Sequence, residues 1–124
     1  MPTVKTLPFG TGAYIKSEGN GDISREAVTI VSGAGALLAG TVLGKITASG
    51  KYKPYDNDAS DGSEVAAAIL YADVDATSAD VKATVTARQA EVWKERLIWG
   101  AGVTTDAEKT AAYADFAALG IIAR

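Results

Sequence analysis

Residues 81–88 alternate between apolar and polar side chains without a break. The apolar positions are Val81, Ala83, Val85 and Ala87, and the polar positions between them are Lys82, Thr84, Thr86 and Arg88. Successive side chains of a β-strand point to opposite faces, so this pattern predicts a strand with one apolar and one polar face. A fold that contains β-sheet is therefore expected.

Other segments also predict strands. Residues 28–31 are β-branched and end at a turn signal in residues 32–35, while residues 41–43 and 45–47 precede a turn at Ser49 and Gly50. Pro54 lacks a ladder donor, which predicts an edge or a bend.

The apolar run of residues 65–72 fits either a buried strand or a buried helix, and propensity alone favours the helix. The polar turn before this run and the acidic residues 73–75 after it leave little room for a helix of ordinary length. We therefore predict a strand here.

The C-terminal segment carries the best helix signal. Thr105 and Glu108 have the spacing of a capping box, in which each side chain binds the backbone amide of the other residue. The residues predicted to share one apolar face are Ala112, Tyr113, Phe116 and Leu119. Gly120 suits the left-handed position that ends a helix, and residues 121–122 are predicted to form a terminal strand. A short turn or helix is expected within residues 93–99.

Residues 1–26 differ in composition from the rest of the chain. They hold two of the three Pro, and they include the Gly-rich stretch of residues 18–22. We predict an extended N-terminal arm over residues 1–26 and a β-rich domain over residues 27–124. Residues up to about Asp22 are expected to contribute little to the core.

Length and charge limit the possible partners. A chain of 124 residues fits one domain that buries about two thirds of its unfolded surface, so oligomerisation would help to stabilise it. The formal net charge of −3 argues against nucleic acid as a partner. Apolar stretches are too short to span a membrane, and Lys5 has no apolar signal-peptide region after it. With no Cys and no His, the chain cannot form disulfides or thiolate metal sites.

Nucleotide-binding motifs are incomplete. Residues 33–35 lack the third Gly of a dinucleotide fingerprint, because Leu38 stands there. Gly44 and Lys45 are followed by Ile46, where a phosphate loop needs Ser or Thr. A turn is the better interpretation of both segments.

The acidic segments also lack required partners. Residues 56–64 begin like a calcium loop, but Asp61 replaces the sharp-turn Gly and Ala67 replaces the bidentate Glu, so a solvated turn is favoured. The remaining carboxylates considered for acid–base chemistry are Asp73, Asp75 and Asp80, and neither His nor Cys accompanies them. We therefore expect no catalytic activity, no metal and no cofactor.

The two tryptophans allow two interpretations. Trp93 and Trp99 could form a platform for sugar stacking, although anchors of a core or an interface are the more common role of such residues. Arg88 and Arg96 are expected to pair with the nearby Glu91 and Glu95.

A succession of short blocks resembles the phage lambda-like head decoration protein family over nearly the whole chain. The blocks are residues 20–26 (NGDISRE), 28–33 (VTIVSG), 39–47 (AGTVLGKIT), 50–55 (GKYKPY), 61–70 (DGSEVAAAIL), 88–92 (RQAEV), 97–99 (LIW) and 119–124 (LGIIAR). The resemblance implies a β-clip fold, homotrimers, and a place outside expanded capsids at threefold and quasi-threefold positions. It also implies synthesis in the host cytoplasm, binding to the major capsid protein, and stabilisation of the shell.

The resemblance assigns capsid binding to the arm. In the family the N-terminus adds main-chain hydrogen bonds to a capsid strand, a mode of binding known as β-augmentation. The corresponding residues here are Thr3, Val4, Lys5, Thr6, Leu7, Pro8 and Phe9. The alternative is an adhesion or carbohydrate-binding module on a virion or cell surface, which would use the turn around Asp56 or the tryptophans.

Overall fold

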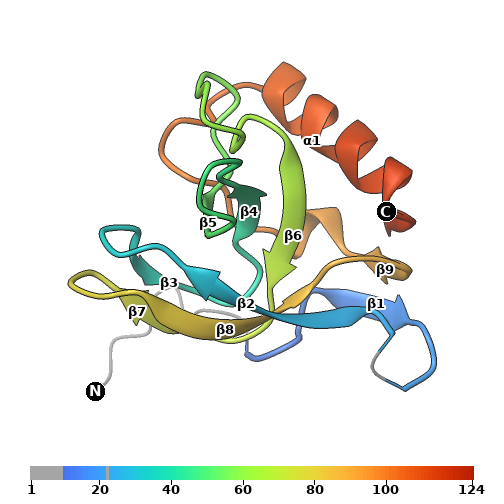
Figure 1. Ribbon diagram of the computed structural model, residues 1–124. Helices are drawn as coiled ribbons and strands as arrows, with labels where there is room; N and C mark the ends of the chain where they lie inside the picture. The colour runs from blue at the N-terminus through green and yellow to red at the C-terminus, as the bar shows by residue number, and fades with distance from the viewer. Residues whose placement is uncertain (1–9, 22) are drawn as a thin grey trace, which may run out of the picture.

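The computed structural model describes residues 10–21 and 23–124 (Figure 1). Five strands form a closed barrel in the order β2-β5-β4-β6-β8. These are β2 (Arg25–Ile30), β4 (Val42–Lys45), β5 (Tyr52–Pro54), β6 (Ala66–Leu70) and β8 (Val81–Thr86). Within the described residues the chain is mainly β and has a single α-helix near its C-terminal end, which confirms the predicted class and is compatible with a β-clip.

The alternating segment forms strand β8, as predicted, although it ends at Thr86. Strand β8 pairs antiparallel with β2 from Ile30↔Val81 to Arg25↔Thr86. Val85 is fully buried in the barrel, whereas Lys82 is exposed on the opposite face. Alternation along the chain thus becomes a two-faced ribbon, which runs across the lower part of Figure 1.

The ambiguous apolar run forms strand β6, so the predicted strand is confirmed. It pairs antiparallel with both β4 and β8, and Ala68, Ile69 and Leu70 are fully buried. The strand predicted around residues 41–43 and 45–47 is confirmed as β4, which covers only Val42–Lys45, and Pro54 ends β5. Sheet pairing on two sides decides between strand and helix here, because it satisfies the backbone groups of a short buried segment.

Among the described residues, five short strands lie outside the barrel. Strand β9 (Ala90–Val92) pairs antiparallel with β1 (Ile15–Glu18) and parallel with β10 (Ile121–Ala123), which confirms the predicted terminal strand. Strands β3 (Gly35–Leu37) and β7 (Val74–Ala76) form a separate antiparallel pair. We did not predict β1, β3, β7 or β9, because segments of three or four residues are too short to show a period.

The helix α1 (Asp106–Ala118) begins at the predicted capping box. Thr105 Oγ1 accepts from the Glu108 amide at 3.3 Å, and Glu108 Oε1 accepts from the Thr105 amide at 3.1 Å. Gly120 follows the helix with a φ of +82°. Phe116 is buried, but the predicted apolar face is wrong for Leu119, which is 37% exposed because it caps the helix beyond its last turn. The 3₁₀-helix η1 (Lys94–Arg96) confirms the turn expected in residues 93–99.

The core has two parts. The barrel core contains Ile30, Leu43, Leu70 and Val85. A second core lies between the barrel and α1, and its largest members are Tyr14, Tyr55, Phe116 and Ile121. In Figure 1 α1 lies along one side of β6 and covers this second core.

Part of the predicted arm contributes to the second core. Tyr14 is only 1% exposed, and residues 15–18 form strand β1 against β9. The expectation that residues up to about Asp22 contribute little to the core is therefore wrong at Tyr14. Composition misled the prediction, since a Gly-rich segment can still place one large side chain in a core that distant residues build.

Candidate functional site

The residues predicted to bind the capsid lie outside the described residues. They are Thr3, Val4, Lys5, Thr6, Leu7, Pro8 and Phe9. The next segment, residues 10–14, shows how this part of the chain joins the fold, and we call it the arm root. Its contacts decide how firmly the chain is held next to the segment that is predicted to bind the capsid.

Gly12 holds the arm root against strand β6's C-terminal end. Its amide donates to the Tyr71 carbonyl at 2.9 Å, and its φ is +68°. A Cβ at this position would lie 2.9 Å from Cε1 of Tyr71. Glycine fits here for two reasons, since it tolerates a positive φ and leaves space for the tyrosine ring.

Tyr14 fixes the arm root to the barrel. Its hydroxyl lies 2.6 Å from Thr86 Oγ1 in β8 and donates to the Ile69 carbonyl in β6 at 3.3 Å. Burial raises the pKa of Tyr14 far above its ordinary value of 10.0, so the phenol remains neutral and can donate. Because β6 and β8 are neighbouring barrel strands, one side chain joins the arm root to both.

Hydrogen bonds to two backbone carbonyls hold the other side of the arm root. The Trp93 amide donates to the Tyr14 carbonyl at 2.8 Å, and Arg96 Nη1 donates to the Ala13 carbonyl at 2.9 Å. These donors come from the segment that leads into and forms η1. The arm root is thus held between the barrel and η1.

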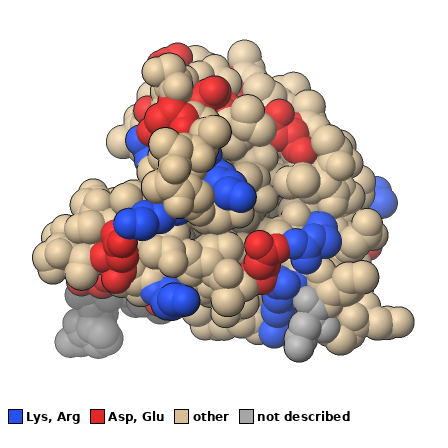
Figure 2. Space-filling view, in the orientation of Figure 1, with Lys and Arg blue, Asp and Glu red and all other residues tan. Residues whose placement is uncertain are grey.

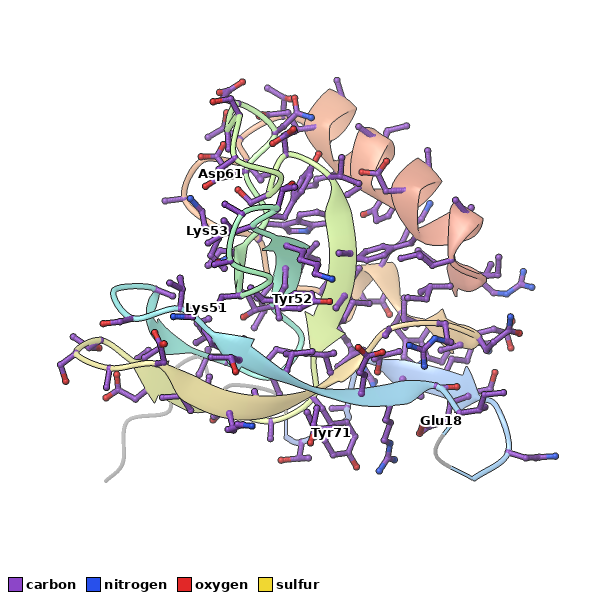
Figure 3. All side chains as sticks on the ribbon, viewed as in Figure 1. Glu18, Lys51, Tyr52, Lys53, Asp61 and Tyr71 are labelled. Atoms are coloured by element: carbon purple, nitrogen blue, oxygen red, sulfur yellow. The ribbon has the colours of Figure 1, made fainter. Side chains whose placement is uncertain are left out.

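The surface beside the arm root combines a ring, a cation and a carboxylate. The Arg25 guanidinium lies 4.3 Å from the ring centroid of Tyr71, and it binds both carboxylate oxygens of Glu18 at 3.1 and 2.9 Å. Figure 3 shows Tyr71 and Glu18 on the lower side of the β2–β8 ribbon. A hollow of about 280 Å³ lies beside Tyr71, and its lining includes Ala27, Ala72, Val74, Lys82 and Thr84.

The two tryptophans carry cations on their rings. The Lys16 ammonium lies 4.3 Å from the Trp93 ring centroid, and the Lys109 ammonium lies 5.8 Å from that of Trp99. Trp99 also packs edge-to-face against Tyr55, at a centroid distance of 6.2 Å. Trp99 is therefore an anchor of the second core. A sugar that stacked on either ring would have to compete with a lysine.

The acidic turn, residues 56–64, is held mainly by its own side chains. Asp56 accepts from the Asp58 amide at 3.0 Å, and Glu64 accepts from the Gly62 amide at 2.8 Å. Hydrogen bonds from Ser63 and Lys53 lower the pKa of Asp61 well below its ordinary value of 3.8. Figure 2 shows acidic side chains over this turn at the top of the view, and Figure 3 shows Lys53 beside Asp61.

The other candidate carboxylates stabilise separate turns. Asp73 accepts from the Ala39 amide, Asp75 from the Thr77 amide, and Asp80 from the Ser32 amide. Among the described residues, no three carboxylates lie close enough together to hold a metal ion. The three aspartates therefore do not form a common site in the part of the chain described here.

The predicted ion pairs are partly wrong. Arg88 pairs with Glu26 rather than Glu91, and Glu91 pairs with Arg124 at 2.5 Å. Strand pairing explains the change, because β2 runs beside β8 and brings Glu26 close to the end of that strand. The residues that our prediction missed altogether are Tyr14 and Tyr71. Their only signal in the sequence was position. Tyr14 is an aromatic residue that follows two glycines, and Tyr71 stands near the end of an apolar run.

Comparison with known proteins identifies the family. No helix among the described residues is long and apolar enough to cross a membrane. A comparison with curated proteins gave no match. The family model described as bacteriophage lambda head decoration protein D matches residues 4–121, which include the arm root, the barrel and α1. The chain belongs to the bacteriophage lambda head decoration protein D family.

Proposed function

We propose that the protein binds the outside of the expanded phage capsid as a homotrimer, at threefold and quasi-threefold positions, and stabilises the shell. The observation that carries this proposal is the family match, which extends over residues 4–121 of the 124-residue chain. A capsid decoration role follows from the family. The trimer, its position and its effect on the shell are the finer parts of the proposal.

Attachment is assigned to residues 3–9, which add an extended strand to the major capsid protein. Main-chain hydrogen bonds supply affinity in such β-augmentation, and they require an unpaired segment that is held at one end. The arm root supports this assignment. Tyr14 and Gly12 hold the chain at the point where the arm begins, so a bound arm would transmit force to the barrel rather than unwind a loop.

Trimerisation makes weak contacts durable. A trimer presents three arms, and once one arm is bound the other two bind at high effective concentration. The small size of the domain also supports association, since a chain of this length buries only about two thirds of its unfolded surface. The protein would be made in the host cytoplasm and would reside on the outer surface of the virion.

The alternative, a carbohydrate-binding adhesin, has less support. Lys16 and Lys109 lie over the rings that a sugar would need, and Trp99 packs into the second core. In the acidic turn, the carboxylates of Asp56, Asp61 and Glu64 already accept hydrogen bonds from amides of the turn. An enzymatic role has no support from the family, which is a class of structural capsid proteins.

Binding to empty shells tests the proposal. The purified protein is mixed with empty, expanded shells of its own phage in the absence of glycan, and bound protein is measured by sedimentation. Light scattering during size exclusion gives the mass of the free protein. Saturable binding and a mass three times that of the chain are expected. A monomer that binds glycans but not shells would identify an adhesin instead.

A further inference from the structure

One face of the domain places cations over aromatic rings. Its residues are Lys16, Trp93, Lys94, Arg96 and Tyr113, and we call it the aromatic–basic face. The Trp93 ring centroid lies 4.3 Å from the Lys16 ammonium and 5.7 Å from the Arg96 guanidinium. The Tyr113 ring centroid lies 4.7 Å from the Lys94 ammonium. Strand β1, η1 and α1 each contribute to this face.

Ring–cation contacts cluster on this face. Three of them, at 4.3, 4.7 and 5.7 Å from ring centroid to cation, lie among its five residues. Trp, Tyr and Arg are also the residue types that contribute most to binding at protein interfaces. Trp93, Tyr113 and Arg96 therefore match residue types that are enriched at binding surfaces, whereas the two lysines are suited to a contact made through charge.

The two lysines of this face differ from the ion-paired cations of the domain. Arg25, Lys51 and Lys53 form ion pairs with carboxylates at 2.6–3.1 Å. Within the described residues, neither Lys16 nor Lys94 forms such a pair. Each is positioned over a ring instead, and a ring leaves the ammonium able to bind an anionic group from a partner.

Few carboxylates compete for these lysines. Glu91 lies near enough to Lys16 for their charges to interact, but it is held by Arg124 at 2.5 Å and by the Ser17 hydroxyl at 2.8 Å, while Glu95 is exposed on η1. The face is therefore locally positive on a chain whose formal net charge is −3. Such a patch can orient a protein on an acidic surface even though the chain as a whole is negative.

The face adjoins the arm root. Trp93 and Arg96, which belong to the face, donate hydrogen bonds to the carbonyls of Tyr14 and Ala13, and Lys16 follows Tyr14 by two residues. The nine residues before Gly10 can span at most about 30 Å when extended. A partner bound by residues 1–9 is therefore held within about 30 Å of the arm root, a range that includes this face.

We propose that the aromatic–basic face is a second contact with the shell, and that it docks on a carboxylate-bearing segment of the major capsid protein's outer surface. The proposal rests on the proposed function, because the arm is what brings the face to the shell. Lys16 and Lys94 bind the carboxylates, and the rings of Trp93 and Tyr113 hold the two ammonium groups in place. The arm supplies most of the affinity, and the face fixes the orientation of the domain.

The test removes the two charges and retains the side-chain length. In the variant K16Q/K94Q, the salt concentration that halves binding to empty expanded shells should fall, and the apparent Kd should rise by about tenfold at physiological salt. The control K45Q/K82Q makes the same change in net charge at two exposed lysines of β4 and β8, outside the face, and it should bind like the wild type. Melting temperature and trimer mass should be unchanged in both variants.

Each outcome has a separate meaning. If wild-type protein binds the shells and K16Q/K94Q binds them with the same Kd and salt dependence, the face is not a shell contact and only this inference fails. If K16Q/K94Q loses the trimer, the face is a contact between copies of the chain, which also overturns the inference. If wild-type protein does not bind shells at all, the proposed function fails together with it.

Discussion

The arm root and the acidic turn are both short segments without helix or strand, yet they are held in different ways. The Tyr14 hydroxyl in the arm root bonds to residues 55 and 72 positions away in the sequence. In the acidic turn, Asp61 and Ser63 are bonded across only two positions. The shape of the arm root is therefore set by the barrel, whereas that of the acidic turn is set largely by its own residues. Substitutions in the two segments should differ accordingly in their cost.

The largest effect is expected for Tyr14→Ala. This change removes a buried ring from the second core and leaves a cavity beside Thr86, which should lower the free energy of unfolding by about 3–5 kcal/mol. Urea denaturation at a fixed protein concentration measures the loss, because the stability of any oligomer depends on concentration. A loss below about 1 kcal/mol would show that the arm root is not part of the core.

Tyr14→Phe separates the ring from the hydroxyl in the same experiment. It keeps the packing but removes the hydrogen bonds to Thr86 and Ile69, so a smaller loss of about 1–2 kcal/mol is expected. Equal losses for the two variants would assign the whole effect to the hydroxyl.

A smaller effect is expected for Gly12→Ala. The alanine would have to adopt the left-handed backbone of Gly12, at φ +68°, and its Cβ would lie 2.9 Å from the Tyr71 ring. Together these two effects should lower the free energy of unfolding by about 1–2 kcal/mol. Gly10→Ala is the matched control, because a Cβ at Gly10 meets nothing within 4 Å. Thermal denaturation of the two variants should show a lower melting temperature for Gly12→Ala alone. Equal melting temperatures would mean that the arm root adapts freely.

The smallest effect is expected in the acidic turn, for Asp61→Asn. Asp61 is exposed, and its carboxylate accepts from the Ser63 amide at 3.0 Å and from Lys53 at 3.1 Å. These hydrogen bonds lower its pKa, so the carboxylate stabilises the fold above its ordinary pKa of 3.8 and loses this contribution as the pH falls through the lowered value. The difference in melting temperature between wild type and variant should be small at pH 7 and should vanish in strong acid. A difference that grows toward low pH would have the wrong sign for this mechanism.

The same contrast explains what the sequence could predict about the fold. The alternation in residues 81–88 and the capping box at Thr105 depend on neighbours in the sequence, and both were predicted correctly. Strands β1 and β9 could not be found in this way, because each has only three or four residues and depends on a partner far along the chain. Leu119 was misassigned for a related reason, since the end of the helix turns it away from the core.

The site was less predictable than the fold. The resemblance pointed to residues 3–9 as the attachment segment, but it gave no sign that Tyr14 is buried or that Gly12 packs on Tyr71. Both facts depend on the position of the barrel relative to residues 10–14. The partner of Arg88 was missed for the same reason, because Glu26 comes from a neighbouring strand.

Deletion of residues 1–9 tests the central claim most directly. Occupancy of empty expanded shells is measured by cryo-electron microscopy for the wild type and for the truncated protein at the same concentration. We predict three copies around each threefold position for the wild type, and almost none for the truncated protein, whose melting temperature and trimer mass should be retained. Wild-type occupancy by the truncated protein would contradict the account and would assign attachment to the folded domain.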